Sequence, residues 1–229
     1  MRDLILLHGA LGCKEQLEPL DDGLSAAFRI HRFNFAGHGG EPLTERFSIP
    51  VFGEQLRRYI TAHSISRALI FGYSMGGYIA LWLARHHPEL VDRVATLATK
   101  FGWNTATAER EANMLDPLVM EQKVPGFAAS LRKMHHPENW KNVVAATAGM
   151  MRDLGEHPVL QNVEFASIST PVLLMLGDRD KMVSIEETSA VYRQLPQSQL
   201  CILPSTSHPV EQVDVPLLTL HLQRYFTAN

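Results

Sequence analysis

Short apolar runs alternate with longer amphipathic segments along most of the chain. Most of these runs are continuous rather than alternating in polarity, which is typical of strands that are buried on both faces. The runs are residues 4–7, 28–35, 68–71, 91–97, 172–176 and 199–203. Because each run has the length of a buried strand, the pattern predicts a sheet of about six strands.

Segments with helical spacing separate the runs. In each segment the apolar residues recur at intervals of three or four positions, as they do on one face of a helix. They are Leu17, Leu20 and Leu24; Phe52, Leu56, Tyr59 and Ile60; Ile79, Leu83 and Ala84; Val191 and Leu195; and Leu217, Leu218, Leu222 and Phe226. Alternation of strands and helices favours βαβ units, so the expected fold class is α/β, a doubly wound parallel sheet with helices on both faces.

One stretch, residues 102–165, breaks this alternation. It contains no strand-like run, is rich in Ala, Met, Glu and Lys, and is punctuated by Pro117, Pro125, Pro137 and Pro158. This composition favours several short helices, and the stretch is too long for a structureless loop in a compact domain. We therefore predict a core formed by residues 1–101 and 166–229, with residues 102–165 as a helical insertion.

Composition and charge narrow the class of protein. The chain has 229 residues, of which 45% are hydrophobic and 20% charged, and its net charge is −3. This usage is typical of a globular domain. Acidic and basic residues are interspersed, so nothing favours a nucleic acid or an anionic membrane as a partner. We expect a small-molecule substrate and either a monomer or a homodimer.

Cysteine usage and the N-terminal residues favour the cytoplasm. Cys13 and Cys201 are the two cysteines, too few for a disulfide framework and more typical of free thiols in a reducing compartment. The first apolar run covers only residues 4–7 and ends at His8, whereas a secretory signal needs about 7–15 apolar residues. No apolar run approaches the length of a membrane span.

The main chemical signal is Ser74, at the centre of Gly72-Tyr73-Ser74-Met75-Gly76. A G-x-S-x-G string is weak by itself, but here a strand-like run precedes it and a helical segment ending at Pro88 follows it. Ser74 is thus expected at a strand-to-helix turn, where small flanking residues let strand and helix approach and helix N–H groups are free. The alternative is a serine of purely structural use in a tight turn.

A serine nucleophile needs a base and a group that orients the base. Among eleven histidines, His208 lies in a loop directly after the last strand-like run. In a parallel sheet that loop lies at the same carboxyl edge as Ser74. Asp178 and Asp180 both follow the preceding strand-like run, so the residues alone leave two candidates for the orienting acid.

Five segments carry a resemblance to a known family. They read LLHGALG, FNFAGHGGE, GYSMGG, GDRDKMV and STSHPVE, in the order and at the spacing of the α/β-hydrolase superfamily. The resemblance covers nearly the whole chain and implies that residues 102–165 form a helical cap. It also implies Asp180 as the acid, because Gly177 and Val183 match the family's pattern around it. Many relatives have two strands before the first one here, so the implied sheet lacks them.

The resemblance implies the chemistry as well. Ser74 would attack a carbonyl, His208 would transfer the proton, and Asp180 would orient the imidazole. The backbone N–H groups of Ala10 and Met75 would form the oxyanion hole. Neither a metal nor an organic cofactor is expected, since no carboxylate or thiolate stands at ligand spacing from the paired histidines.

Three aromatic residues are candidates for substrate contact. Phe101 and Trp103 follow the strand after the nucleophile segment, at the hinge into the cap. Tyr78 stands directly after GYSMGG, where similar enzymes that make a menaquinone precursor by elimination usually carry Arg. Cap methionines are an open case, because Met lines adaptable pockets and also packs between helices.

The sequence thus favours a serine hydrolase that cleaves a small or medium ester, thioester or amide through an acyl-enzyme. One alternative uses the same triad for C–C cleavage, elimination or acyl transfer, although Tyr78 lacks the charge that a carboxylate-binding lyase would use. Another is a non-catalytic receptor that closes its cap over a ligand. Dehalogenase and epoxide hydrolase chemistry is disfavoured because both need Asp in place of Ser74.

Overall fold

A computed structural model describes residues 1–228 and contains one parallel sheet of six strands. The strand order is β2-β1-β3-β4-β5-β6, and β1 pairs Leu4 with Ile30 on one side and with Leu69 on the other. The strands are β1 (Arg2–Leu7), β2 (Phe28–Arg32), β3 (Ala68–Tyr73), β4 (Val91–Leu97), β5 (Val172–Gly177) and β6 (Ser198–Leu203). The predicted α/β fold with about six parallel strands is confirmed.

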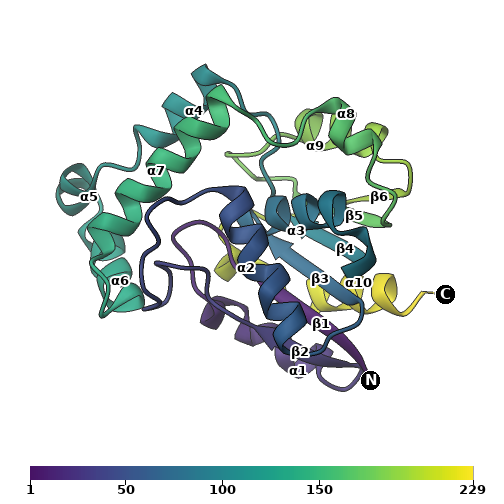
Figure 1. Ribbon diagram of the computed structural model, residues 1–229. Coiled ribbons are helices and arrows are strands. Elements are labelled where there is room, and N and C mark those ends of the chain that lie inside the picture. The colour runs from purple at the N-terminus through teal and green to yellow at the C-terminus, as the bar shows by residue number, and fades with distance from the viewer. Residues whose placement is uncertain (229) are drawn as a thin grey trace.

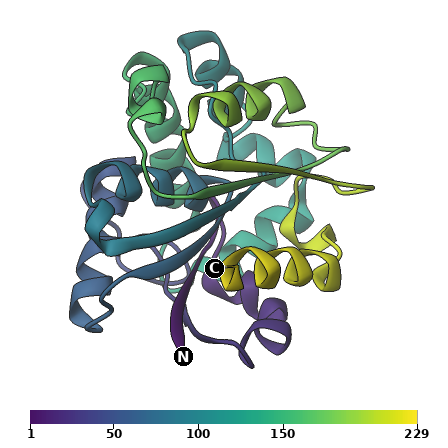
Figure 2. The same cartoon turned by 90° about the vertical axis from the view of Figure 1, so that its right-hand side faces the viewer.

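Helices cover both faces of the sheet, as Figure 1 shows. One face packs against α2 (Ile49–Ala62), α3 (Met75–His86) and α9 (Ile185–Gln194). Figure 2 shows α10 (Val215–Thr227) on the opposite face. Because alternate residues of a strand point to opposite faces, Ile5 and Leu7 enter one apolar core while Leu4 and Leu6 enter the other. Burial on both faces explains why inner strands such as β1 contain continuous apolar runs.

The structure corrects the predicted end of the second strand. β2 ends at Arg32 rather than at Phe35, because the chain leaves the sheet there. The ring of Phe33 stacks on Tyr59 with centroids 4.7 Å apart, and the N–H of Phe35 donates to Nε2 of His8 at 3.2 Å. Phe33 and Phe35 pack against a helix and a loop rather than within the sheet. Because they are apolar, the sequence pattern does not distinguish them from a continuation of the strand.

The first predicted helical segment is short and irregular. Residues Lys14–Leu20 form a 3-10 helix with Pro19 inside it, and α1 adds only Asp21–Leu24. Proline offers no amide hydrogen for an α-helical bond, which limits a regular helix here. Leu17, Leu20 and Leu24 are nevertheless buried in the second apolar core, on the side of α10.

Five helices occupy the segment between β4 and β5. They are α4 (Thr105–Ala112), α5 (Pro117–Lys123), α6 (Pro125–His135), α7 (Trp140–Glu156) and α8 (Asn162–Ala166). Pro117 and Pro125 each take the first helical position, where the missing N–H costs nothing. Figure 1 shows α4 to α7 grouped to one side of the sheet, with α8 beside α9. Within residues 1–228 no helix is long and apolar enough to cross a membrane.

Candidate active site

Ser74 occupies the turn between β3 and α3. Its backbone has φ 51° and ψ −116°, a positive φ that costs a non-glycine residue about 1–3 kcal/mol. Four hydrogen bonds hold it in place, the longest from the N–H of Tyr78 to the Ser74 carbonyl at 3.4 Å. The Ser74 N–H donates to the carbonyl of Leu97 at 2.8 Å, and the Ser74 carbonyl accepts from the N–H of Gly77 and from Oγ1 of Thr99, both at 3.0 Å.

Two glycines let the strand and the helix meet at this turn. A Cβ on Gly72 would lie 2.4 Å from the carbonyl oxygen of Gly76, and a Cβ on Gly76 would lie 2.6 Å from the carbonyl oxygen of Leu7. Both clashes are with backbone atoms, which cannot rotate away as the end of a side chain can. Close packing therefore requires the two glycines on either side of Ser74.

His208 and Asp180 form a hydrogen-bonded pair at the carboxyl edge of the sheet. Nδ1 of His208, after β6, lies 2.8 Å from Oδ2 of Asp180, after β5. Oδ1 of Asp180 accepts from the N–H groups of Met182 at 2.8 Å and Val183 at 2.9 Å. The Asp180 side chain is 0% exposed and that of His208 is 14% exposed, so solvent reaches only the imidazole.

The two candidate aspartates differ in their surroundings. Asp178 accepts a hydrogen bond from the backbone N–H of Thr206 at 3.1 Å, whereas Asp180 is the partner of His208. Burial opposes ionisation of Asp180, but hydrogen bonds from His208 and from two backbone N–H groups outweigh it and hold the pKa of Asp180 below its usual value. Asp180 is thus a carboxylate near neutral pH, suited to orienting the Nδ1–H of an imidazole.

Ser74 and His208 border the same cavity. Within residues 1–228, Asp180 is the hydrogen-bond partner of the His208 imidazole, which leaves Nε2 free. The hydroxyl of Tyr73 donates to the backbone carbonyl of His208 at 3.1 Å and ties this loop to β3. Bonds between a nucleophile and its base often form fully only in the substrate complex.

Two backbone N–H groups are available beside Ser74. Met75 is the first residue of α3, so its N–H has no acceptor inside the helix. Ala10 lies in the turn that the bond from the Gly12 N–H to the Gly9 carbonyl closes at 3.1 Å. Neither N–H has a backbone acceptor in the described part of the chain, and both residues border the cavity.

The turn that contains Ala10 is hydrogen-bonded to a buried, neutral histidine, His8. Nδ1 of His8 donates to the carbonyl of Gly9 at 2.8 Å, while Nε2 accepts from the N–H of Phe35. Burial lowers the pKa of His8 to about 4. The rings of His38 and His135 lie nearby, yet no group of His, Cys, Asp or Glu in residues 1–228 could hold a metal ion.

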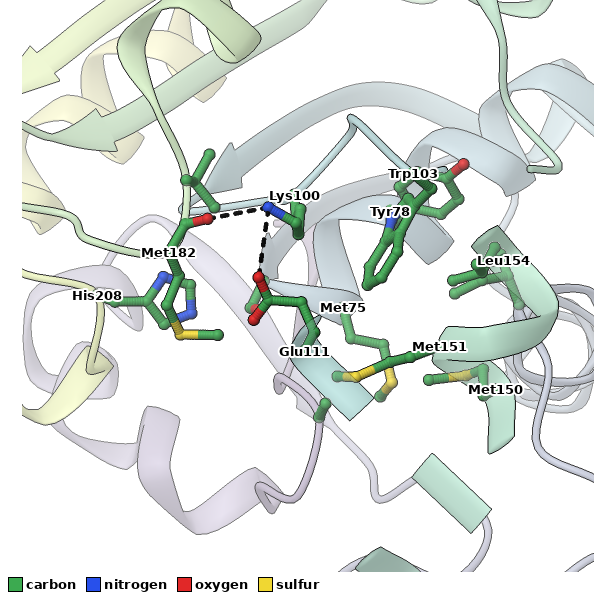
Figure 3. Close-up of a pocket in the computed structure, with 14 residues that line it drawn as sticks. Met75, Tyr78, Lys100, Trp103, Glu111, Met150, Met151, Leu154, Met182 and His208 are labelled. Atoms are coloured by element: carbon green, nitrogen blue, oxygen red, sulfur yellow. Dashed lines mark hydrogen bonds and ion pairs between the residues drawn. The ribbon is translucent and has the colours of Figure 1, made fainter. Parts of the chain in front are cut away.

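The cavity beside Ser74 is mainly apolar, with one charged patch. Its volume is about 50 Å³, room for a few water molecules. Its apolar lining includes Ile49, Met75, Met150, Met151, Leu154 and Met182. Lys100 and Glu111 also line it, as Figure 3 shows.

The sequence analysis did not identify Lys100 and Glu111. Lys100 follows β4 at the carboxyl edge of the sheet, a position that could have drawn attention to it. Glu111 lies in α4, and a charged residue in an amphipathic helix normally indicates an exposed face. Only the tertiary structure, in which α4 packs against α7 and Glu111 faces Lys100, buries it.

The three aromatic candidates have different positions. Trp103 and Tyr78 border the cavity with Ser74, whereas Phe101 lines a neighbouring one. The Tyr78 hydroxyl accepts from the N–H of Leu160 at 3.2 Å and lies 3.4 Å from the Leu160 carbonyl, so it faces the chain rather than the cavity. Phe101 packs edge-on against Phe165 at 5.7 Å. Contact of Phe101 with a substrate stays a prediction, since Phe101 lines the cavity next to the one that Ser74 borders.

Known proteins resemble this chain along nearly its whole length. A family model described as alpha/beta hydrolase fold matches residues 4–136. A pimeloyl-[acyl-carrier protein] methyl ester esterase of Chromobacterium violaceum is 29% identical, covering 96% of this chain and 94% of its own. A Bacillus subtilis protein assigned as a 2-succinyl-6-hydroxy-2,4-cyclohexadiene-1-carboxylate synthase is 27% identical, covering 94% and 86%. The crystal structure of an enol-lactonase from Burkholderia xenovorans matches with a TM-score of 0.80 at 18% identity, covering 99% and 92%.

Proposed function

The chain is an enzyme of the α/β-hydrolase fold family, and we propose that it is a serine hydrolase that cleaves a small or medium carboxylic ester, thioester or amide. Membership follows from the match over residues 4–136, more than half of the chain. The observation that carries the proposal is the 2.8 Å hydrogen bond between His208 and Asp180, beside the cavity that Ser74 borders.

In the proposed mechanism Ser74 Oγ attacks the carbonyl carbon of the substrate while Nε2 of His208 takes the hydroxyl proton. Asp180 orients the imidazole and stabilises the imidazolium. The N–H groups of Ala10 and Met75 donate to the oxyanion, and each such donor is worth roughly 10²–10³ in rate. His208 then protonates the leaving group, and a water molecule activated by the same imidazole releases the acid from Ser74.

The proposed cap is residues 102–165, on a core formed by residues 1–101 and 166–229. Trp103, Met150 and Met151 from the cap complete the apolar wall of the cavity opposite His208. The apolar lining and the cavity volume of about 50 Å³ favour a short aliphatic acyl group.

The Bacillus subtilis relative supports a second candidate, elimination by the same triad. Two features favour hydrolysis over it. The Tyr78 hydroxyl is bonded to the backbone of Leu160 and supplies no cation for a substrate carboxylate. Lys100, a cation that lines the cavity, lies 3.8 Å from both Glu111 and Glu187, so its charge is balanced.

A panel of p-nitrophenyl esters of increasing acyl length tests the proposal. We expect release of p-nitrophenol that is fastest with short acyl groups and that Ser74→Ala lowers by about 10⁴-fold or more. Ser64→Ala is the matched control, since Ser64 is an exposed serine that also has a positive φ, 55°. Equal turnover by Ser74→Ala and the wild type would contradict the proposal.

A further inference from the structure

Two charged side chains, Lys100 and Glu111, lie in the wall of the proposed active-site cavity (Figure 3), and Glu187 and Arg110 contact them from outside that wall. Nζ of Lys100 lies 3.8 Å from Oε1 of Glu111 and 3.8 Å from Oε2 of Glu187, and it donates to the backbone carbonyl of Met182 at 3.0 Å. Arg110 donates to Oε1 of Glu111 at 2.9 Å. Lys100 comes from the loop after β4 and Glu111 from α4, so the pair joins the core to the cap.

Glu111 carries an unused acceptor. Its side chain is 4% exposed, and Oε2 is buried without a hydrogen-bond partner among residues 1–228. Buried carboxylate oxygens are normally hydrogen-bonded, because a buried charge without a partner is strongly destabilising. Both charged contacts of Glu111 fall on its other oxygen, Oε1, so Oε2 is free to accept a hydrogen bond from a ligand.

Lys100 carries unused donors in the same place. An ammonium group has three N–H donors, and the hydrogen bond of Nζ within residues 1–228 goes to the carbonyl of Met182. The two carboxylates at 3.8 Å are ion pairs rather than close hydrogen bonds. A ligand that reaches both Lys100 and Glu111 would therefore find a donor and an acceptor together.

The charges around Lys100 and Glu111 determine which functional group of a ligand can bind there. Two cations, Lys100 and Arg110, face two carboxylates, Glu111 and Glu187. A substrate carboxylate would meet the charge of Glu111, and a substrate ammonium would meet that of Lys100, so each would face a like charge. A hydroxyl is neutral, donates to a carboxylate and accepts from an ammonium, and so uses both free groups at once.

We propose that Lys100 and Glu111 form a subsite for a hydroxyl group on the ester substrate. This inference rests on the proposed serine hydrolase function and adds the class of its substrate, an aliphatic ester with one hydroxyl on its chain. The aliphatic part fits the rest of the lining, which is formed by apolar residues such as Met75, Met150 and Met151.

The test compares methyl esters of one homologous series of alkanoic acids, whose chains end in a methyl, hydroxyl, carboxylate or ammonium group. At the best chain length, kcat/KM for the hydroxyl-ended ester exceeds that for the methyl-ended ester roughly 10- to 100-fold, the usual effect of hydrogen bonds to charged groups. It also exceeds the values for both charged esters. Glu111→Met lowers the hydroxyl-to-methyl ratio to about 1. Glu109→Met is the control, because Glu109 on the same helix is 49% exposed and pairs with Arg152.

Lys100→Met is a second variant and lowers the same ratio, which keeps the test valid if Glu111→Met does not fold. A ratio that stays at the wild-type value in both variants means that the pair only joins cap to core, and it overturns the subsite. Preference for the carboxylate-ended or ammonium-ended ester overturns it as well.

Binding of the same esters to Ser74→Ala, measured by isothermal titration calorimetry, separates this inference from the proposed function. The hydroxyl-ended ester binds roughly 10-fold or more tightly than the methyl-ended one. Equal affinities overturn the subsite even if the wild type hydrolyses esters. If no ester is hydrolysed but the hydroxyl preference in binding is present, the proposed function fails and the subsite stands.

Discussion

Protonation of His8 is expected to make the fold sensitive to acid. His8 is 0% exposed, and both of its ring nitrogens are used, one as a donor to Gly9 and one as an acceptor from Phe35. The ring of His38 lies 5.1 Å away between centroids. Burial lowers the pKa of His8 and of His38, so the native state holds both rings neutral.

The size of the effect follows from the pKa. Burial lowers the pKa of His8 from 6.5 to about 4, and each unit corresponds to about 1.4 kcal/mol. Between these values the unfolded chain binds a proton at this residue and the folded chain does not, so the free energy of unfolding rises with pH. The contribution of His8 is complete above pH 6.5, and about 3 kcal/mol of it is lost as the pH falls to about 4.

Urea unfolding followed by circular dichroism at several pH values between about 7 and 4.5 checks this prediction. His8→Asn leaves the N–H of Phe35 without its acceptor and lowers the free energy of unfolding at neutral pH by about 1–3 kcal/mol. Its loss of stability with acid is shallower than that of the wild type, by up to about 1.4 kcal/mol per pH unit. His63→Asn, at an exposed position, controls for the loss of one histidine. Equal slopes for His8→Asn and the wild type would mean that protonation of His8 does not destabilise the fold in acid.

Three further variants test the geometry around Ser74. Asp180→Asn lowers kcat for a p-nitrophenyl ester roughly 10³- to 10⁴-fold because the imidazole loses its orienting carboxylate, whereas Asp178→Asn changes kcat less than about 10-fold. Gly76→Ala places a Cβ 2.6 Å from a backbone oxygen and lowers the free energy of unfolding by more than about 2 kcal/mol in urea; Gly126→Ala, whose Cβ meets nothing within 4 Å, does not. Tyr78→Phe removes the hydroxyl that bonds to the backbone of Leu160. It lowers the free energy of unfolding by about 1–3 kcal/mol, which a lower melting temperature reveals.

The sheet could be predicted from the sequence mainly because its inner strands, such as β3 and β5, are buried on both faces. In β5 every residue is buried, so its sequence is a continuous apolar run. Exposed elements do not have such a run. The same reasoning extended β2 too far, since Phe33 and Phe35 are apolar for another reason. They pack against Tyr59 and His8 outside the sheet, and an apolar run does not say which partner buries it.

The site was predictable where the backbone fixes it. Parallel strands bring their carboxyl ends to one edge, which places Ser74, Asp180 and His208 on three loops at that edge. The direction of a side chain is a different matter. Phe101 follows β4 at the same edge, yet it packs against α8. The amphipathic pattern of α4 predicts that Glu111 is exposed. In the structure Glu111 is buried and lies 3.8 Å from Lys100, a tertiary contact that the pattern does not indicate.

The central claim is that Ser74 is an activated nucleophile, and labelling with a fluorophosphonate tests it most directly. Folded wild-type protein is incubated with the probe and the modified peptide is located by mass spectrometry. We expect a single label at Ser74, which is absent after unfolding in urea and strongly slowed in His208→Gln. If Ser74 of the folded protein stays unmodified, or labels no faster than the exposed Ser64, Ser74 is not an activated nucleophile.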